Sequence, residues 1–151
     1  MNGSEDEKWM SLALEQAKIA ASEGEIPVGA VVVKDGAVLS AAHNHCECER
    51  DATAHAELLA ISAACRGTGS WRLSDCTLYV TLEPCPMCAG AAINSRVRRI
   101  VYGAKNPRAG ACESLIRLPK YPLESSPACL GGVLQTECLQ LLHSFFAEKR
   151  K

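Results

Sequence analysis

The chain has 151 residues, 48% of them apolar, so we expect a single domain over residues 1–151 that is large enough to bury its own core. The formal net charge of −1 does not by itself select or exclude a class of partner, but the charges are unevenly placed. Residues 1–25 contain six acidic and two basic side chains, whereas residues 96–120 contain seven basic and one acidic. A basic segment on a neutral protein suits a docked polyanion, although an ordinary solvated face has the same composition.

The sequence contains no signal for export or membrane insertion. The N-terminus is polar and acidic, unlike a signal peptide, and no apolar run reaches the length of a membrane-spanning helix. The chain contains nine cysteines, an odd number. We therefore expect a cytoplasmic protein without a membrane partner, whose cysteines are reduced thiols or metal ligands.

Hydrophobic periodicity and turn signals predict helices and strands in a mixed order. Ser4 and Glu7 form a capping box before the first helix. The segment 34–36 is a hairpin turn signal, and Asp51 or Thr53 is the candidate N-cap of the second helix. The predicted elements are a helix over 4–24, strands over 30–33 and 37–42, a helix over 53–65, a strand over 77–82, a helix over 85–94, a strand over 99–103 and a helix over 133–149.

The remaining segments are less regular. Residues 43–52 are polar, and residues 118–132 are rich in Pro, Ser and Gly. A fifth strand over Leu130–Val133 is a hypothesis. The order of elements predicts a mixed sheet covered by helices, which is an α/β layered domain.

Two separated stretches contain the residue types of a zinc site. His55-Ala56-Glu57 comes first, and Pro84-Cys85-Pro86-Met87-Cys88 follows, with Cys85 placed 28 residues after Glu57. Together they give H-x-E…P-C-x-x-C, the pattern of zinc-dependent nucleobase deaminases. One imidazole and two thiolates leave a fourth zinc position for water, so the Glu57 carboxylate is free to move protons.

The spacing within each stretch has consequences for geometry. Cys85 and Cys88 are three residues apart at the start of a predicted helix, where they share a face and the helix dipole favours thiolate. Glu57 follows His55 by two residues, which is not a same-face spacing. Both side chains reach one site only if the pocket lies across the start of their helix.

A structural zinc site is the alternative interpretation, because a cysteine elsewhere could supply a fourth ligand. A second metal cluster is also open, in which Cys46 and Cys48 join Cys112 and Cys129. Three further cysteines fit core positions as small apolar side chains, and His143 fits a surface or interface position. The three core cysteines are Cys65, Cys76 and Cys138.

The chain resembles the bacterial tRNA-specific adenosine deaminases (the TadA type), which belong to the cytidine deaminase-like superfamily, over nearly its whole length. The residues that carry the resemblance are Pro27-Val28-Gly29-Ala30, Asn44, Asp51 to Glu57, Leu78 to Ala91, Asn94-Ser95-Arg96, Tyr102-Gly103-Ala104, Gly110-Ala111 and Ser114-Leu115. The resemblance implies a three-layer α/β/α sandwich with a mixed five-stranded sheet. It also implies a homodimer, with one Zn²⁺ per subunit, that converts adenosine to inosine at the wobble position of a tRNA anticodon.

The same resemblance implies roles for individual residues. His55, Cys85 and Cys88 would ligate zinc, Glu57 would shuttle protons, and Asn44 would hydrogen-bond the purine. Phe145 would touch flanking nucleotides, although core or dimer packing explains it equally well. The expected walls of the base pocket are Pro27, Val28, Ala56 (through its backbone) and Leu82.

The sequence departs from the family pattern in places. Ala52 stands where the family usually has Pro, and Leu118–Gly132 does not match well. Asn106 stands where the family commonly has Asp. Because an amide carries no charge, we hypothesise that Asn106 relaxes the selectivity for RNA and allows deamination of adenine in single-stranded DNA.

Two other functions remain open at this point. A deaminase of a free purine base or nucleoside, of the guanine, adenosine or cytidine type, would use the same motif. A zinc-stabilised RNA-binding module would use the metal without catalysis. Glu57 distinguishes the RNA-binding module from an enzyme, because a module without catalysis does not need a carboxylate at this position.

Overall fold

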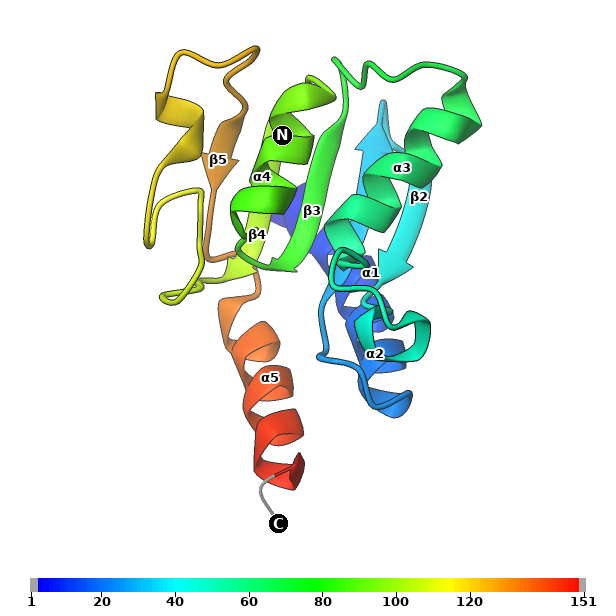
Figure 1. The fold of residues 1–151 in the computed structure, drawn as a ribbon, viewed down its shortest axis with the longest axis vertical. Helices are drawn as coiled ribbons and strands as arrows, with labels where there is room; N and C mark the ends of the chain where they lie inside the picture. The colour runs from blue at the N-terminus through cyan, green and yellow to red at the C-terminus, as the bar shows by residue number, and fades with distance from the viewer. Residues whose placement is uncertain (1–2, 150–151) are drawn as a thin grey trace.

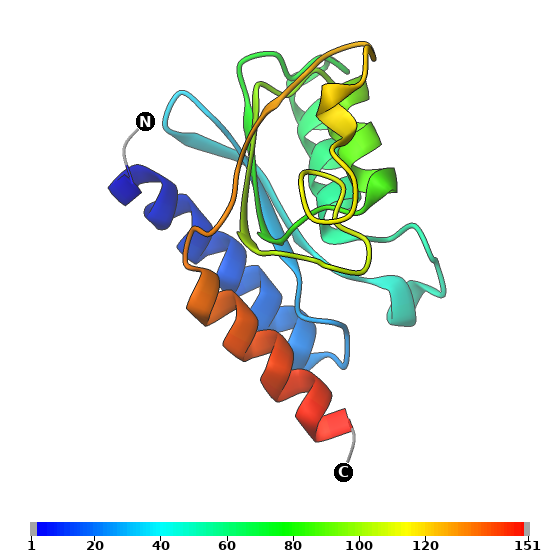
Figure 2. The same cartoon turned by 90° about the vertical axis from the view of Figure 1, so that its left-hand side faces the viewer.

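The computed structural model of the chain describes residues 3–149, with side chains from Glu5 onward. Five strands form one sheet that lies between two layers of helices (Figures 1 and 2). The expected three-layer α/β/α sandwich with a mixed sheet is therefore confirmed. The elements are α1 (Gly3–Ser22), β1 (Gly29–Lys34), β2 (Ala37–His43), α2 (Cys46–Glu49), α3 (Ala56–Thr68), β3 (Thr77–Leu82), α4 (Pro86–Asn94), β4 (Arg99–Ala104), the 3₁₀ helix η1 (Leu118–Lys120), β5 (Ala128–Leu130) and α5 (Gln135–Lys149).

The strands lie in the order β2-β1-β3-β4-β5. β1 pairs antiparallel with both β2 and β3, whereas β3, β4 and β5 run parallel to one another. The hairpin between β1 and β2 turns at Asp35 and Gly36, whose φ angles of 50° and 74° suit the tight turn of a two-residue hairpin. Because β3 and β4 are parallel, their carboxyl ends meet at the same edge of the sheet.

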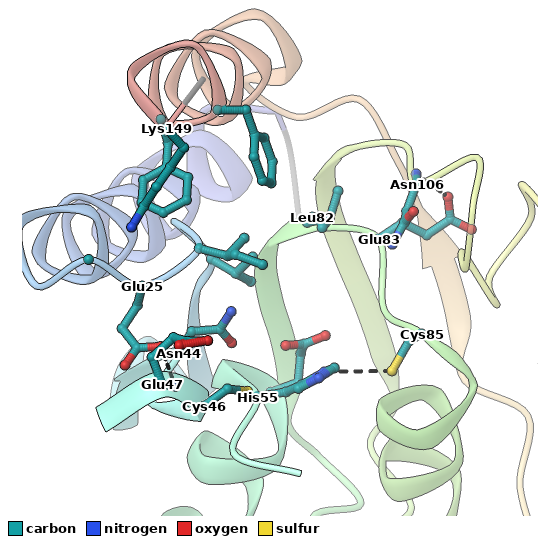
Figure 3. A pocket seen from close by; sticks show the side chains of 16 residues that line it. Glu25, Asn44, Cys46, Glu47, His55, Leu82, Glu83, Cys85, Asn106 and Lys149 are labelled. Atoms are coloured by element: carbon teal, nitrogen blue, oxygen red, sulfur yellow. Dashed lines mark hydrogen bonds between the residues drawn. The ribbon is translucent and has the colours of Figure 1, made fainter. Parts of the chain in front are cut away.

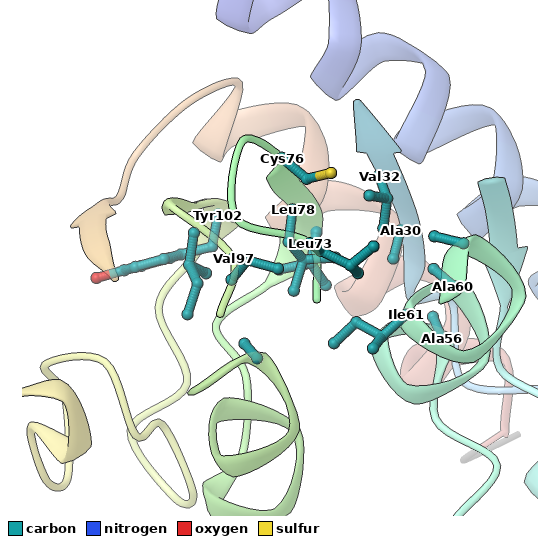
Figure 4. Packing of buried hydrophobic residues seen from close by; sticks show 14 of the residues in the cluster. Ala30, Val32, Ala56, Ala60, Ile61, Leu73, Cys76, Leu78, Val97 and Tyr102 are labelled. Atoms are coloured by element: carbon teal, nitrogen blue, oxygen red, sulfur yellow. The ribbon is translucent and has the colours of Figure 1, made fainter. Parts of the chain in front are cut away.

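Side chains alternate between the two faces of the central strands. Leu78 and Val80 of β3 are fully buried on the face that α3 and α4 cover (Figure 4), and Tyr79 between them is fully buried on the opposite face. Figure 2 shows α1 and α5 side by side on that opposite face. There the buried Asp6 of α1 accepts hydrogen bonds from the Tyr79 hydroxyl at 2.8 Å and from Arg99 at 3.1 Å. These bonds tie α1 to β3 and β4.

The predicted start of the second helix was wrong. α3 begins at Ala56 with His55 as its N-cap residue. The Asp51 carboxylate instead accepts hydrogen bonds from the backbone and hydroxyl of Thr53 in a local turn. The predicted capping box includes Ser4, whose side chain lies outside the described residues.

Two segments assigned little structure contain short elements. The helical turn α2 lies within the segment predicted to be irregular, and the hypothesised fifth strand lies at Ala128–Leu130 rather than Leu130–Val133. Gly132, with φ of 90°, follows β5 and turns the chain toward α5. Within residues 3–149, no helix combines the length and the apolar character needed to cross a bilayer.

Candidate active site

Three side chains from two helix starts converge at the edge of the sheet where β3 ends. His55 Nδ1 lies 3.6 Å from Cys85 Sγ and 3.5 Å from Cys88 Sγ. Tetrahedral zinc with bonds of about 2.0 Å to nitrogen and 2.3 Å to sulfur places these atoms about 3.5 Å apart. The donor types and their separations therefore fit a zinc ion.

The backbone presents these ligands in a specific way. His55 is the N-cap residue of α3, and Cys85 is the N-cap residue of α4, with Cys88 in the first turn. Both helix dipoles thus point their positive ends at the ligands and favour bound anions. Hydrogen bonds from Cys88 and His55 lower the pKa of the Cys85 thiol to about 4, so a thiolate is ready to bind a cation.

The described part of the chain brings together three possible ligands for a metal ion at this site. Among the residues with described side chains, these are the only His, Cys, Asp or Glu residues whose ligand atoms form a mutually close group, within 4.8 Å of one another. A structural zinc site would require a fourth protein ligand. The arrangement therefore fits a site that leaves a position open, which is the condition for zinc catalysis.

Glu57 is the buried carboxyl group beside this cluster. It lies in the first turn of α3 and is only 4% exposed. Burial raises the pKa of the Glu57 carboxyl to about 7, close to the range that suits a group that takes and returns protons at neutral pH. His55 and Glu57 line the same pocket because the pocket lies across the start of α3.

The pocket is a cavity of about 440 Å³ (Figure 3). This volume suits a small-molecule ring system such as a nucleobase. Apolar side chains from several elements form part of its wall, and Lys149 adds a cationic group. The lining residues are Gly24, Glu25, Ile26, Val28, Asn44, Cys46, Glu47, His55, Glu57, Leu82, Glu83, Cys85, Asn106, Phe145, Phe146 and Lys149.

Most of the predicted substrate-binding residues line this pocket, but Pro27 and Ala56 are not among its lining residues. Both are buried. The Ala56 backbone was expected to form a wall of the base pocket, and its amide donates to Asn44 Oδ1 at 3.0 Å. Asn44 itself lines the pocket and is 8% exposed.

The hydrogen bond to Ala56 fixes what Asn44 can offer a ligand. Its Oδ1 is occupied at the start of α3, so its Nδ2 group is left to donate into the cavity. Asn106 is similar, because its Oδ1 accepts from the amides of Arg108 and Ala109 at 3.3 and 3.2 Å. Its side-chain NH₂ group is likewise the part left for a ligand.

Two buried carboxylates at the pocket were missed by the sequence analysis. Glu25 accepts the amides of Glu47 and Cys48 at 3.0 and 2.7 Å, which holds α2 in place. Glu83 accepts hydrogen bonds from a loop that follows β4. No local pattern marks either residue, because their hydrogen-bond partners lie more than 20 residues away in the chain.

The basic segment 96–120 does not form one surface. Arg99 begins β4 and is paired with Asp6, whereas Lys105 directly follows the end of β4. A strand of six residues spans about 17 Å, so Arg99 and Lys105 lie at opposite ends of β4. Arg96 is held by Glu124 at 3.3 Å. Lys105 and Arg108 are the members that border the groove beside α5.

The proposed four-cysteine cluster is wrong. Cys46 and Cys48 lie on α2 next to Glu25, at the side of β2. Cys112 and Cys129 lie near Glu83 and Glu113, at the side of β5. β2 and β5 are opposite edges of the sheet. Of the predicted core cysteines, Cys76 and Cys138 are buried and Cys65 is partly buried, while His143 is exposed.

Comparisons with known proteins agree with this chemistry. A family model described as MafB19-like deaminase matches residues 4–136. The chain is 47% identical over 148 residues to the tRNA-specific adenosine deaminase of Bacillus subtilis, covering 97% of this chain and 92% of that protein.

Two solved structures are similar in fold and sequence. One, from work on A-to-I editing by tRNA:A34 deaminases at the wobble position of transfer RNA, has a TM-score of 0.87 and 42% identity, over 89% of this chain and 99% of the other. The guanine deaminase of Bacillus subtilis has a TM-score of 0.63 and 40% identity, over 70% of this chain and 66% of the other.

Proposed function

The chain belongs to the family of tRNA-specific adenosine deaminases, and from this premise we propose that it converts adenosine to inosine at the wobble position of a tRNA anticodon with one Zn²⁺ per subunit. A single observation carries the proposal. His55, Cys85 and Cys88 converge beside the buried Glu57 in a cavity of about 440 Å³. This is the geometry that hydrolytic deamination of a nucleobase requires.

The metal and Glu57 have separate tasks. Zinc held by the imidazole and the two thiolates would supply a water that is nucleophilic at neutral pH. Glu57 takes one proton of the water as the water oxygen attacks C6 of adenine, and passes this proton to the adjacent ring nitrogen. It then takes the remaining hydroxyl proton and delivers it to the departing amino group, which leaves as ammonia. One carboxyl group thus acts first as base and then as acid, and hypoxanthine and ammonia account for all atoms.

The pocket walls would select and orient the base. Val28 and Leu82 line the pocket and would supply apolar contacts to the base. Asn44 would donate from Nδ2 to an acceptor nitrogen of the purine ring. A base within a helical stack does not reach a pocket of this depth, so the adenosine must be turned out of a loop or a single strand.

Charged and aromatic groups at the rim favour a polynucleotide over a free base. Lys149 and Phe145 line the pocket, and Lys105 and Arg108 border the adjoining groove. Cations beside a base-sized cavity suit the phosphates of the neighbouring nucleotides, and an aromatic ring suits a stacked base. The alternative for Phe145, dimer packing, predicts that its truncation changes the oligomeric state rather than the Michaelis constant.

Asn106 supports a second proposal, relaxed selectivity between RNA and single-stranded DNA. With its Oδ1 occupied by the Arg108 and Ala109 amides, the side chain presents donors and no charge to a bound strand. An Asp at this position would present its second carboxylate oxygen, which accepts a ribose 2′-OH and repels phosphate. Matched RNA and DNA hairpins assayed with the wild type and Asn106→Asp test this, and an unchanged DNA-to-RNA ratio would eliminate the idea.

We also propose that the protein is a homodimer, as its family resemblance implies, and that its tRNA substrate places it in the cytoplasm. Sedimentation of the zinc-loaded protein tests the first point. A monomer at micromolar concentration that is fully active would contradict it.

The substrate test is an inosine readout on a matched panel. We expect inosine in an anticodon stem-loop with adenosine at the wobble position, and at least about 100-fold lower efficiency with free adenosine, adenine or guanine, which lack the phosphate contacts. Equal efficiency with a free base or nucleoside would favour the small-molecule deaminase instead. Binding of the stem-loop without any turnover would favour an RNA-binding module.

A further inference from the structure

Glu83 is a buried carboxylate enclosed by the loop that follows β4. It is 1% exposed. Its Oε2 accepts the backbone amides of Cys112, Glu113 and Ser114 at 3.1, 2.8 and 2.9 Å, and its Oε1 accepts the amide of Asn106 at 3.1 Å. The Ser114 hydroxyl also donates to Oε1. Five donors from one loop therefore meet a single side chain.

This arrangement uses the loop as an anion-binding nest. Three consecutive amides aimed at one point form a concavity that favours negative charge, and the charge that fills it belongs to the protein itself. Hydrogen bonds to an ionised acceptor are about twice as strong as neutral ones. The loop from Asn106 to Ser114 is thus wrapped around the Glu83 carboxylate.

Gly110 shows how closely the loop is fitted. A Cβ atom at this position would lie 2.4 Å from Glu83 Cδ and 2.5 Å from both of its carboxylate oxygens. Side chains do not approach that closely, so any residue other than glycine must push the loop and the carboxylate apart. The Gly110 amide also donates to the Asn106 carbonyl at 2.7 Å, which closes the loop on itself.

The position of Glu83 links this loop to the chemistry. Glu83 follows Leu82, which lines the pocket, and precedes the turn that presents Cys85. At the other end of its hydrogen bonds, Asn106 lines the pocket (Figure 3) and Arg108 borders the adjoining groove. One carboxylate therefore joins the end of β3 to the part of the rim that would meet a polynucleotide.

We propose that Glu83 is a positioning residue that holds the Asn106–Ser114 loop in its substrate-binding conformation and so controls substrate affinity rather than the chemical step. The expected change in KM rests on the proposed function, whereas the expected change in the mobility of the loop does not. Loss of the carboxylate frees the loop, so the Michaelis constant rises while zinc content and turnover number stay the same.

The first experiment measures Glu83→Gln, in which the inserted NH₂ group faces amide donors. We expect amide hydrogen exchange in residues 106–114 to accelerate at least tenfold, KM for the stem-loop to rise about tenfold, and kcat to remain within about twofold. Asp6→Asn is the matched control, because Asp6 is also a buried carboxylate but lies on the opposite face of the sheet. It should lower Tm without changing KM.

Substitutions in the loop itself provide a second test if Glu83→Gln folds poorly. Ser114→Ala removes one of the five donors, and we expect a KM rise of two- to threefold. Gly110→Ala should raise KM about tenfold in the wild type. In a Glu83→Ala background the carboxylate that a Cβ at position 110 would meet is gone, so Gly110→Ala should not raise KM further. A double-mutant cycle would detect this as coupling between the two positions.

The proposal would be overturned by unchanged exchange of the 106–114 amides in Glu83→Gln, by a KM change no larger than in Asp6→Asn, or by additive effects of the Gly110 and Glu83 substitutions. Zinc loss from Glu83→Gln would equally overturn it, by placing the role at the metal-binding turn. If the wild type forms no inosine, the proposed function fails, and the exchange experiment still decides the role of Glu83 in the loop.

Discussion

Substitutions of Asn44 can separate effects on stability from effects on substrate binding, because the side-chain oxygen and nitrogen have different partners. Oδ1 accepts the Ala56 amide at the start of α3, and Nδ2 is left for the ligand. Replacing Asn44 with Asp keeps an oxygen for the Ala56 amide and exchanges the donor for a second acceptor. Replacing it with Ala removes both.

The expected magnitudes follow from these contacts. Loss of the cap in Asn44→Ala costs about 1 kcal/mol, which lowers Tm by about 3 °C in a protein of this size. Asn44→Asp retains the cap and places a negative charge at a helix N-terminus, so its Tm should change by less than about 1 °C. In both variants an acceptor of the bound purine loses its donor, at about 2–3 kcal/mol, so kcat/KM should fall roughly 30- to 150-fold.

Thermal unfolding and deamination of an anticodon stem-loop, measured on the same preparations, test this separation. We expect Asn44→Asp to melt like the wild type and to lose as much activity as Asn44→Ala. If Asn44→Asp kept kcat/KM within about threefold of the wild type, Nδ2 would have no role in base recognition and the reasoning would be refuted.

Three further predictions concern packing, pH and the metal. Gly29→Ala would place a Cβ 2.0 Å from the Ala13 carbonyl oxygen of α1, so we expect a loss of about 3 kcal/mol in urea unfolding; an unchanged midpoint would contradict this. Burial acts to raise the pKa of Glu25, but backbone hydrogen bonds including that of Cys48 outweigh burial and lower it. Its stabilisation is therefore present above the usual pKa of 4.5 and lost as pH falls through the lowered value. Glu25→Gln should flatten the acid limb of Tm against pH; parallel limbs would argue against the pKa shift. Removal of zinc by a chelator should abolish turnover and restored zinc should recover it, except in Cys88→Ser; activity that survives chelation would contradict a metal-dependent reaction.

The regular elements were predictable because their signals are local. The continuous apolar run of β1 and the apolar residues of β3 are bounded by turn residues, and both strands were placed within one residue of their observed ends. The proposed metal ligands were predictable for a similar reason. His55, Cys85 and Cys88 are few and chemically distinctive, and they occur in a recognisable motif. Cys85 and Cys88 lie at the helix start that the sequence predicts, whereas the helix that follows His55 starts three residues later than predicted.

The missed features depend on contacts between distant segments. The cap of α3 comes from Asn44, 12 residues before Ala56, so a search near the helix start selected Asp51 and Thr53 instead. Glu83 and its loop meet across 23 to 31 residues, and nothing in the local sequence marks them. The run of basic residues was misleading because β4 separates Arg99 from Lys105, and because Arg96 and Arg99 are paired with Glu124 and Asp6.

The central claim is that Glu57 moves protons beside a zinc ion with an open position. It is tested most directly by measuring zinc content and inosine formation together in the wild type and in Glu57→Gln. Because Glu57 lies outside the proposed set of zinc ligands, we expect about one zinc per chain in both proteins. For the variant we expect a loss of at least about 1000-fold in kcat, near the upper part of the range for general acid–base catalysis. Full turnover by zinc-loaded Glu57→Gln, or full turnover by zinc-free wild type, would contradict it.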